Sequence, residues 1–119
     1  MKKRILIIDD DRVTISLARK MLVNAGFYVD AAIESNNAIK LITCNQYDLV
    51  ILDILMPVLN GFDMAELLRS FNIQTKIVFL TNLSDEKTRD RAEKINAERF
   101  ISKEKDFENL PTIIKEVVE

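Results

Sequence analysis

Two short apolar runs, each ended abruptly by acidic residues, constrain the fold of this chain more than any other feature. The first covers residues 5–8 and stops at three aspartates, residues 9–11, and the second covers residues 49–52 and stops at Asp53. Such runs between charged residues are typical of strands buried on both faces of a parallel sheet. The aspartates should therefore meet at the carboxyl edge of one sheet. Like charges this close repel each other unless a cation lies among them, which predicts a site for a divalent cation.

Apolar runs of strand length alternate with helical patterns along the whole chain, which indicates an α/β fold. Right-handed crossovers between five such units favour a single doubly wound five-stranded parallel sheet with strand order 2-1-3-4-5, flanked by five helices. Asp10 and Asp53 would then lie in the crevice between the first and third strands. We expect one domain over residues 1–119. The strands are predicted at residues 5–8, 28–32, 49–52, 77–80 and 99–102.

The spacing of apolar residues predicts which helix faces are buried. A helix at about residues 85–95 carries only a narrow apolar stripe among charged residues, so we expect it to be weakly anchored. A last helix should begin at about Pro111. The first helix should end at Gly26, in a left-handed conformation, and should bury Leu17, Ala18, Met21, Leu22 and Ala25. The third should bury Met64, Leu67, Leu68 and Phe71.

Polar residues predict where some helices begin. Asp11 is predicted to cap the first helix, because aspartate side chains accept hydrogen bonds from the free N–H groups of a first turn. Ser35 or Asn36 is predicted to cap the second helix for the same reason. The dipeptide Asn60-Gly61 is predicted to form a turn.

The composition excludes several classes of function. The net charge is −2 without a basic cluster, so we expect no direct binding to nucleic acid and none to a membrane. A single cysteine, Cys44, and no histidine exclude disulfides, structural zinc and catalysis by histidine. The apolar part of the amino terminus is too short for a signal peptide, and no run approaches membrane-spanning length. We expect a soluble, cytoplasmic protein.

The residues at the predicted strand ends suit phosphoryl transfer. Asp10 and Asp53, helped by Asp9, offer the carboxylate oxygens that Mg²⁺ prefers. Thr81 supplies a hydroxyl at the end of the fourth strand, and Lys103 supplies a mobile ammonium at the end of the fifth. Acidic metal ligands that face a lysine can position a phosphoryl group and neutralise its oxygens. Asp53 is the candidate nucleophile that would become an aspartyl phosphate.

Taken together, these motifs resemble those of the response regulator receiver domain of two-component systems, of the chemotaxis type with a flavodoxin-like fold. The resemblance covers essentially the whole chain, and it rests on the order and context of several short motifs rather than on any one of them. The matching segments are Ile7-Ile8-Asp9-Asp10-Asp11, Asp53-Ile54-Leu55-Met56-Pro57, Asn60-Gly61, Phe79-Leu80-Thr81 and Phe100-Ile101-Ser102-Lys103.

The resemblance implies a phosphoacceptor role for Asp53, with Mg²⁺ as the cofactor. The phosphoryl group would come from a sensor histidine kinase, a phosphotransfer protein or a small acyl or amido phosphate. Asp10, Asp53 and the backbone carbonyl of Leu55 would hold the metal, while Asp9 would act through water. Thr81 and Lys103 would contact the phosphoryl group.

The resemblance also implies how the signal leaves the site. Thr81 and Phe100 would act as switch residues, and the surface of the fourth helix, fifth strand and fifth helix would control a downstream target or an output domain. A phosphorylation-dependent dimer also fits this pattern. The absence of a basic, proline-containing lead-in after Lys103 mildly favours a stand-alone regulator over one excised from a longer protein.

Three departures from the family pattern bear on these expectations. Glu104 follows Lys103 where proline is usual, so the Lys103 loop is expected to be trans and differently placed. Asn82 follows Thr81 where a small residue is usual, which would narrow access to Asp53. Leu55 and Leu83 lie two residues after Asp53 and Thr81, and apolar side chains there would neither orient nor admit water. We therefore expect slow self-dephosphorylation.

Simpler interpretations of single residues remain open. The aspartates at residues 9–11 alone would more often cap a helix than bind a metal. Thr81 alone would be an ordinary strand residue, Lys103 a solvated charge and Phe100 part of the core.

The sequence also bears on other classes of function. A receiver-like interaction module that is never phosphorylated is the main alternative, and Asn82 and Glu104 leave it open. A flavodoxin is disfavoured because three aspartates after the first strand would repel a flavin phosphate. A haloacid-dehalogenase-like phosphatase is disfavoured because Leu55 occupies the place of its second aspartate.

Overall fold

The computed structural model describes residues 2–71, 73–83 and 85–119, and in these residues five parallel strands form one sheet of order β2-β1-β3-β4-β5. This is the predicted order. The strands are β1 (Arg4–Ile8), β2 (Tyr28–Ala32), β3 (Leu49–Leu52), β4 (Lys76–Thr81) and β5 (Arg99–Ser102). The helices are α1 (Arg12–Asn24), α2 (Ser35–Cys44), α3 (Gly61–Ser70), α4 (Glu86–Lys94) and α5 (Leu110–Val118), with a 3₁₀ turn at Phe107–Asn109.

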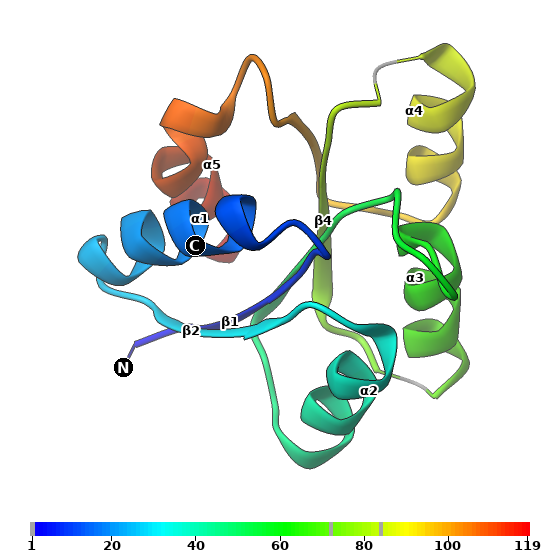
Figure 1. Ribbon diagram of the computed structural model, residues 1–119, viewed down its shortest axis with the longest axis horizontal. Coiled ribbons are helices and arrows are strands. Elements are labelled where there is room, and N and C mark those ends of the chain that lie inside the picture. Colours follow the sequence, from blue (N-terminus) through cyan, green and yellow to red (C-terminus); the bar gives the residue numbers. More distant parts are fainter. Residues whose placement is uncertain (1, 72, 84) are drawn as a thin grey trace.

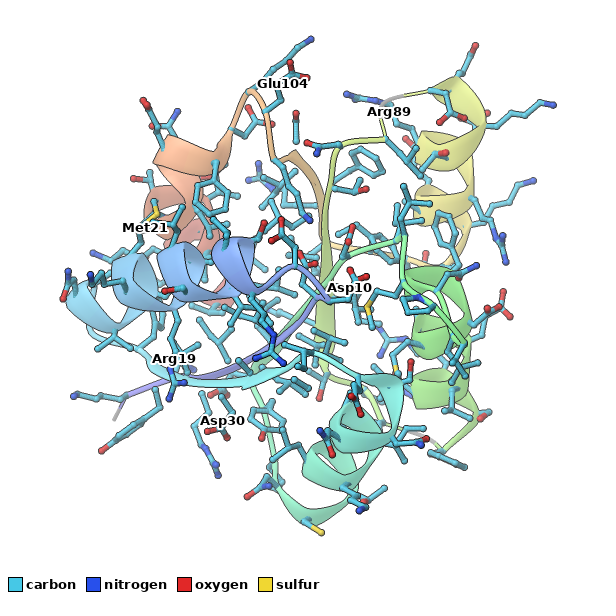
Figure 2. The ribbon with its side chains drawn as sticks, viewed as in Figure 1. Asp10, Arg19, Met21, Asp30, Arg89 and Glu104 are labelled. Atoms are coloured by element: carbon cyan, nitrogen blue, oxygen red, sulfur yellow. The ribbon has the colours of Figure 1, made fainter. Side chains whose placement is uncertain are left out.

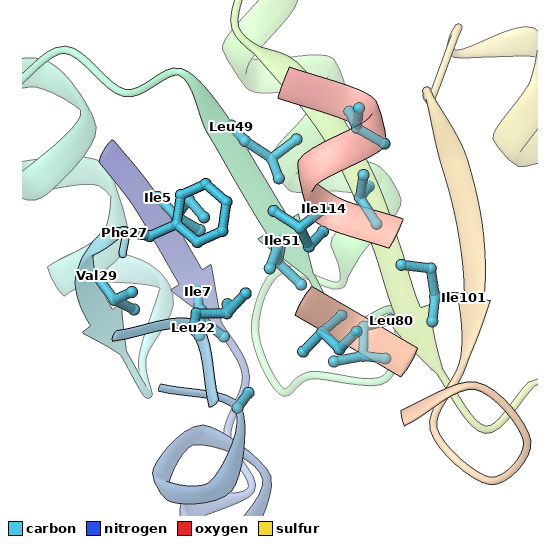
Figure 3. Close-up of a cluster of buried hydrophobic side chains, with 14 of the residues drawn as sticks. Ile5, Ile7, Leu22, Phe27, Val29, Leu49, Ile51, Leu80, Ile101 and Ile114 are labelled. Atoms are coloured by element: carbon cyan, nitrogen blue, oxygen red, sulfur yellow. The ribbon is translucent and has the colours of Figure 1, made fainter. Parts of the chain in front are cut away.

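The helices lie on both faces of the sheet, with α1 and α5 on one face and α2, α3 and α4 on the other (Figure 1). Successive side chains of a strand point to opposite faces, so each strand contributes to two apolar clusters. Ile5 and Ile7 of β1 join the cluster under α1 and α5, whereas Leu6 and Ile8 join the cluster under α2, α3 and α4. Figure 3 shows the first cluster, in which Leu22 of α1 and Ile114 of α5 pack on the strands.

Most of the predicted elements are confirmed, but two buried faces were assigned wrongly. Leu17 is exposed, because α1 is turned so that Thr14, Ile15, Ala18 and Leu22 face the sheet. Phe71 is also exposed, with 53% of its surface accessible, because α3 ends at Ser70 and Phe71 is its C-cap, outside the face that packs on the sheet. In both cases the spacing of apolar residues predicted the helix correctly but predicted one residue as buried that is exposed.

Two predicted helix starts also need correction. The N-cap of α2 is Glu34, whose side chain makes no capping bond, while Ser35 is buried and its hydroxyl donates to the Leu59 carbonyl at 3.4 Å. Asn60 is not in a turn but is the N-cap of α3, where its side chain accepts from the Asp63 N–H at 2.9 Å. The prediction for Asp11 is confirmed, since it caps α1 by accepting from the Val13 N–H at 3.0 Å.

Gly26 follows α1 with a φ of 100°, as predicted for the residue that ends a helix. None of the helices in the described part of the chain combines the length and apolar character needed to cross a bilayer.

Candidate functional site

The register of the central strands brings the acidic residues together. Ile8 of β1 lies opposite Leu52 of β3, so the residues that follow, Asp9 and Asp53, leave the sheet side by side. The Asp53 N–H donates to the Ile8 carbonyl at 2.9 Å, which extends the pairing to the last strand position. Asp10 lies where the chain leaves β1 (Figure 2). One carboxylate oxygen from each of Asp9, Asp10 and Asp53 lies within 4.8 Å of the others.

Two of these three carboxylates are buried. Asp9 is 1% exposed and Asp53 is 6% exposed, whereas Asp10 faces solvent. Burial raises the pKa of Asp9 to about 6, because the charged form loses its hydration and lies beside the negative charge of Asp53. Such a cluster of carboxylates stores electrostatic repulsion that a cation would relieve.

Lys103 supplies a cation to this cluster from the end of β5. Its Nζ lies 2.7 Å from Oδ2 of Asp9 and 3.4 Å from Oδ2 of Asp53. Burial lowers the pKa of Lys103, but its contacts with Asp9 and Asp53 outweigh that effect and raise the pKa above its ordinary value. Lys103 is therefore a charged ammonium held between two buried carboxylates.

The backbone around Lys103 is fixed by residues that sequence reasoning missed. The described residues contain no cis peptide bond, so the Lys103–Glu104 bond is trans as predicted, and Glu104 projects outward at the tip of the loop (Figure 2). Ser102 N–H donates to the Asp106 carboxylate at 3.1 Å, and Asp106 N–H donates back to the Ser102 carbonyl at 2.9 Å. These reciprocal bonds hold the turn. The sequence signal that could have predicted them is an aspartate four residues after the serine that ends the strand.

The start of α1 shapes the other side of the site. Asp9 Oδ1 accepts from the Asp11 N–H at 2.9 Å, which fixes the carboxylate of Asp9 against the backbone. Asp11 itself is engaged as the helix cap, and its contact with the Thr14 hydroxyl at 2.8 Å is the largest cause that lowers the pKa of Asp11. The Asp11 carboxylate is therefore used to cap α1, while the carboxylates of Asp9, Asp10 and Asp53 lie close to one another.

The start of α3 presses against the backbone of Asp53. A Cβ atom at Gly61 would collide with the Asp53 carbonyl, and the Gly61 N–H donates to the Ile54 carbonyl at 3.0 Å. Glycine is required here for close approach, since its φ is not left-handed. Sequence reasoning placed a turn at this point and missed the contact, because it depends on how α3 docks on β3.

The remaining predicted residues lie around the same edge. Thr81 is buried at the end of β4, and its Oγ1 accepts from the Leu83 N–H at 3.2 Å. The Lys103 N–H donates to the Thr81 carbonyl at 3.0 Å, so β4 and β5 deliver these two residues as neighbours. Leu55 is 60% exposed in the loop after Asp53.

Phe100 of β5 is half-buried on the side of the sheet covered by α4. The guanidinium of Arg89 from α4 lies 5.2 Å from the centre of its ring.

The donor set fits Mg²⁺. Carboxylate and carbonyl oxygens are the ligands that this ion takes, usually with only one or two carboxylates bound directly. Asp10 and Asp53 offer such oxygens, and soft ligands that would favour zinc or copper are lacking, because the chain has no histidine and its one cysteine, Cys44, is exposed on α2.

Comparison with known proteins agrees with this geometry. A family model described as the response regulator receiver domain matches residues 5–115. Transcription factor SKN7 of Candida albicans is 40% identical over 85 residues, an alignment that covers 71% of this chain and 15% of that protein. Transcriptional regulatory protein CusR of Escherichia coli is 36% identical over 100 residues, covering 84% of this chain and 44% of that protein. The chain thus spans less than half the length of both relatives.

A solved structure shares the whole fold. Response regulator protein TrrA from Thermotoga maritima, solved in complex with Mg²⁺ and a beryllofluoride, superposes with a TM-score of 0.84 at 32% identity. The superposition covers 98% of this chain and 99% of that one.

Proposed function

This chain belongs to the response regulator receiver domain family of two-component systems, and on that premise we propose that it signals by Mg²⁺-dependent phosphorylation of Asp53. Receiver domains are signalling domains rather than classical enzymes. The observation that carries the proposal is the position of Lys103 Nζ, which lies between the buried carboxylates of Asp9 and Asp53.

In the proposed reaction an oxygen of Asp53 attacks the phosphorus of a phosphohistidine. A P–O bond to Asp53 forms while the P–N bond breaks, and the imidazole of the donor keeps the electron pair and takes up a proton. The Lys103 ammonium moves its contact from the Asp53 carboxylate to a phosphoryl oxygen, and the Thr81 hydroxyl donates to another. Bound Mg²⁺, held by Asp10, Asp53 and the Leu55 carbonyl with Asp9 acting through water, would neutralise charge on the phosphoryl oxygens.

Phosphorylation would then be communicated through β4 and β5. Thr81 Oγ1 would exchange its bond from the Leu83 N–H for one to the phosphoryl group, and Phe100 would change position beside α4. The phosphodonor would be a sensor histidine kinase or a phosphotransfer protein, as for the related response regulators. The changed α4–β5–α5 surface would control a downstream protein or an output domain, or would support a phosphorylation-dependent dimer.

Intact mass and Phos-tag mobility after incubation with acetyl phosphate and Mg²⁺ test this proposal. We expect the wild-type chain to gain one phosphoryl group, and we expect Asp53→Asn and a chelator-treated sample to gain none. Asp90→Asn is a matched control, because Asp90 is an exposed aspartate on α4 outside the site. If wild type gains no phosphoryl group although a titration shows Mg²⁺ binding, a kinase-specific receiver is indicated; if Mg²⁺ also fails to bind, the unphosphorylated interaction module replaces this proposal.

We further propose that the phosphoryl group is hydrolysed slowly. Leu55 is largely exposed beside Asp53 and Leu83 is half-buried after Thr81, and neither side chain can hydrogen-bond an attacking water. Leu55→Asn should shorten the lifetime of the phosphorylated chain several-fold, whereas Val58→Asn, an exposed change in the same loop, should leave it nearly unchanged. Decay followed by Phos-tag mobility measures both, and a wild-type lifetime of only seconds would contradict the account.

A further inference from the structure

The turn after β5 carries Lys103 into the acidic site. β5 ends at Ser102, and Lys103 is the first residue of the segment that leads to the 3₁₀ turn at Phe107–Asn109. Lysine has a long, flexible side chain, so holding its ammonium at one point costs conformational entropy. The Nζ atom nevertheless lies 2.7 Å from Asp9 and 3.4 Å from Asp53. Its position therefore depends on how firmly the backbone at Lys103 is held.

The side chain of Asp106 bonds the backbone of the residue before Lys103. Oδ2 of Asp106 accepts from the Ser102 N–H at 3.1 Å, and the Asp106 N–H donates to the Ser102 carbonyl at 2.9 Å. The Ser102 hydroxyl oxygen accepts from the Lys105 N–H at 3.1 Å. Lys103 itself is joined to β4, because its N–H donates to the Thr81 carbonyl at 3.0 Å. The backbone at Lys103 is thus held by β4 and, through Ser102, by Asp106.

Asp106 is attached to the core by the residues that follow it. Its carbonyl accepts from the Asn109 N–H at 3.0 Å, at the end of the 3₁₀ turn. Phe107 packs against the apolar cluster under α1 and α5, and Leu110 at the start of α5 is fully buried in that cluster. A path of contacts therefore runs from this cluster through Asp106 to the backbone at Lys103.

The Asp106 carboxylate is not used to start the 3₁₀ turn. At the start of a helix an aspartate side chain commonly accepts from the N–H groups of the first turn. Asp106 is the N-cap of the 3₁₀ turn, yet its side chain makes no capping bond and accepts from Ser102. It is also half-buried, whereas Glu104 and Lys105 beside it are exposed. The carboxylate is therefore directed to the end of β5, from which Lys103 extends.

We infer that Asp106 is a positioning residue for phosphorylation of Asp53, which acts through Ser102 to keep the Lys103 ammonium in the site. The inference rests on the proposed function, in which Lys103 contacts the phosphoryl group. Asp106 acts through the backbone and at a distance from the reacting atoms. Its role requires a hydrogen-bond acceptor at this place rather than a negative charge. A reacting or stabilising group misplaced by about 1 Å can cost about a hundredfold in rate.

The rate of phosphorylation of the full chain by acetyl phosphate, at saturating Mg²⁺, tests the inference. We expect Asp106→Ala to slow the reaction by about tenfold, because the backbone at Lys103 loses one of its supports. Asp106→Asn should keep most of the wild-type rate, because its amide oxygen can still accept from the Ser102 N–H.

Asp48→Ala is the matched control. Asp48 also uses its carboxylate to hold a strand, since it accepts from the Arg4 N–H at 2.8 Å. This bond lies where β1 and β3 begin, at the opposite edge of the sheet from the site. Asp48→Ala should therefore be phosphorylated at the wild-type rate even if it lowers stability as much as Asp106→Ala does.

A second measurement does not require phosphorylation. The ¹H–¹⁵N signal of a lysine ammonium is observed when the group is shielded from water, and the Lys103 side chain is only 13% exposed. We expect this signal in wild type, Asp106→Asn and Asp48→Ala, and we expect it to be broadened or lost in Asp106→Ala. If wild type gains no phosphoryl group, the proposed function is in question and the ammonium signal alone decides whether Asp106 positions Lys103.

Several results would overturn the inference. Equal slowing in Asp106→Ala and Asp48→Ala would show that the loss follows stability and not the position of Lys103. A rate for Asp106→Asn as low as that of Asp106→Ala would show that the hydrogen bond to Ser102 is not what matters. An unchanged ammonium signal in Asp106→Ala, or no such signal in folded wild type, would show that Asp106 does not hold Lys103 in the site.

Discussion

The ammonium of Lys103 lies 2.7 Å from Asp9 and 3.4 Å from Asp53, so a single side chain compensates two buried carboxylates. This compensation is incomplete, because the pKa of Asp9 is raised to about 6 by burial in spite of the lysine. The carboxylates therefore retain repulsion that a further cation would relieve. At the scale of single residues, burial of the charged form of Asp9 costs stability.

Replacement of Asp9 by asparagine should stabilise the fold at neutral pH in the absence of Mg²⁺. The pKa of Asp9 rises from 3.8 to about 6 on folding, so its contribution to stability is present at low pH and is lost as the pH rises through about 6. After allowance for the lost contact with Lys103, we expect Asp9→Asn to raise the free energy of unfolding by about 1–2 kcal/mol at pH 7.5.

Urea unfolding at pH 7.5 and pH 5 measures this effect. The gain should be smaller at pH 5, where Asp9 is largely protonated, and Asp10→Asn should give a smaller gain at pH 7.5 because Asp10 is exposed. A loss of stability in Asp9→Asn at pH 7.5, or a gain that grows as the pH falls, would contradict this view of the site.

The sequence predicted which side chains meet at this edge of the sheet better than it predicted the contacts that hold them in place. Asp9, Asp10, Asp53, Thr81 and Lys103 all follow or end strands, and parallel strands deliver such positions to one edge. The contact of Gly61 with the Asp53 backbone and the bonds between Ser102 and Asp106 depend on docking of separate elements, which periodicity does not encode. Val58 has a φ of 72°, an uncommon conformation for a β-branched residue, and its side chain gives no signal of it.

At the scale of elements, α4 is the helix held least by apolar packing. Ala92 is its buried residue, and Arg89 and Arg91 contact β5 and α3. Arg91 lies 4.5 Å from the centre of the Phe62 ring and 3.6 Å from the Glu66 carboxylate, both on α3. Arg89 lies over Phe100 of β5. Besides Ala92, α4 is thus held by exposed cation–π and ionic contacts, which are individually weak. This fits the prediction that the helix is weakly anchored.

Removal of Arg91 should loosen α4 without unfolding the protein. The contacts of Arg91 with Phe62 and Glu66 together contribute about 1 kcal/mol, so Arg91→Ala should lower the local opening free energy of α4 by about that amount. Native-state hydrogen exchange measures this residue by residue. Lys87→Ala, an exposed change in the same helix, should leave exchange in α4 nearly unchanged, and equal acceleration in both variants would show that Arg91 does not anchor the helix.

Most strands and helices were predicted well, but the buried faces of two helices were predicted too wide. The strands at residues 28–32, 49–52 and 99–102 were predicted with their observed bounds, and the last two are short runs with a charged residue on each side. Leu17 and Phe71 were assigned to the core because they are apolar at helical spacing, yet both are exposed. A helix can rotate by a fraction of a turn on the sheet, and hydrophobic spacing alone does not fix that rotation.

At the scale of the whole molecule, two features of opposite charge occupy separate surfaces. The acidic site lies at the carboxyl edge of the sheet, and the exposed cations Arg12, Arg19 and Lys20 lie along α1. The chain spans less than half the length of the relatives CusR and SKN7.

Hydride trapping tests the central claim, phosphorylation of Asp53, most directly. Borohydride reduces an aspartyl phosphate to homoserine, and tandem mass spectrometry of the digested protein then locates the modified residue. After treatment with acetyl phosphate and Mg²⁺, we predict homoserine at position 53 alone, and none when the metal is removed. Homoserine at position 9 or 10, or modification that persists without Mg²⁺, would contradict the account.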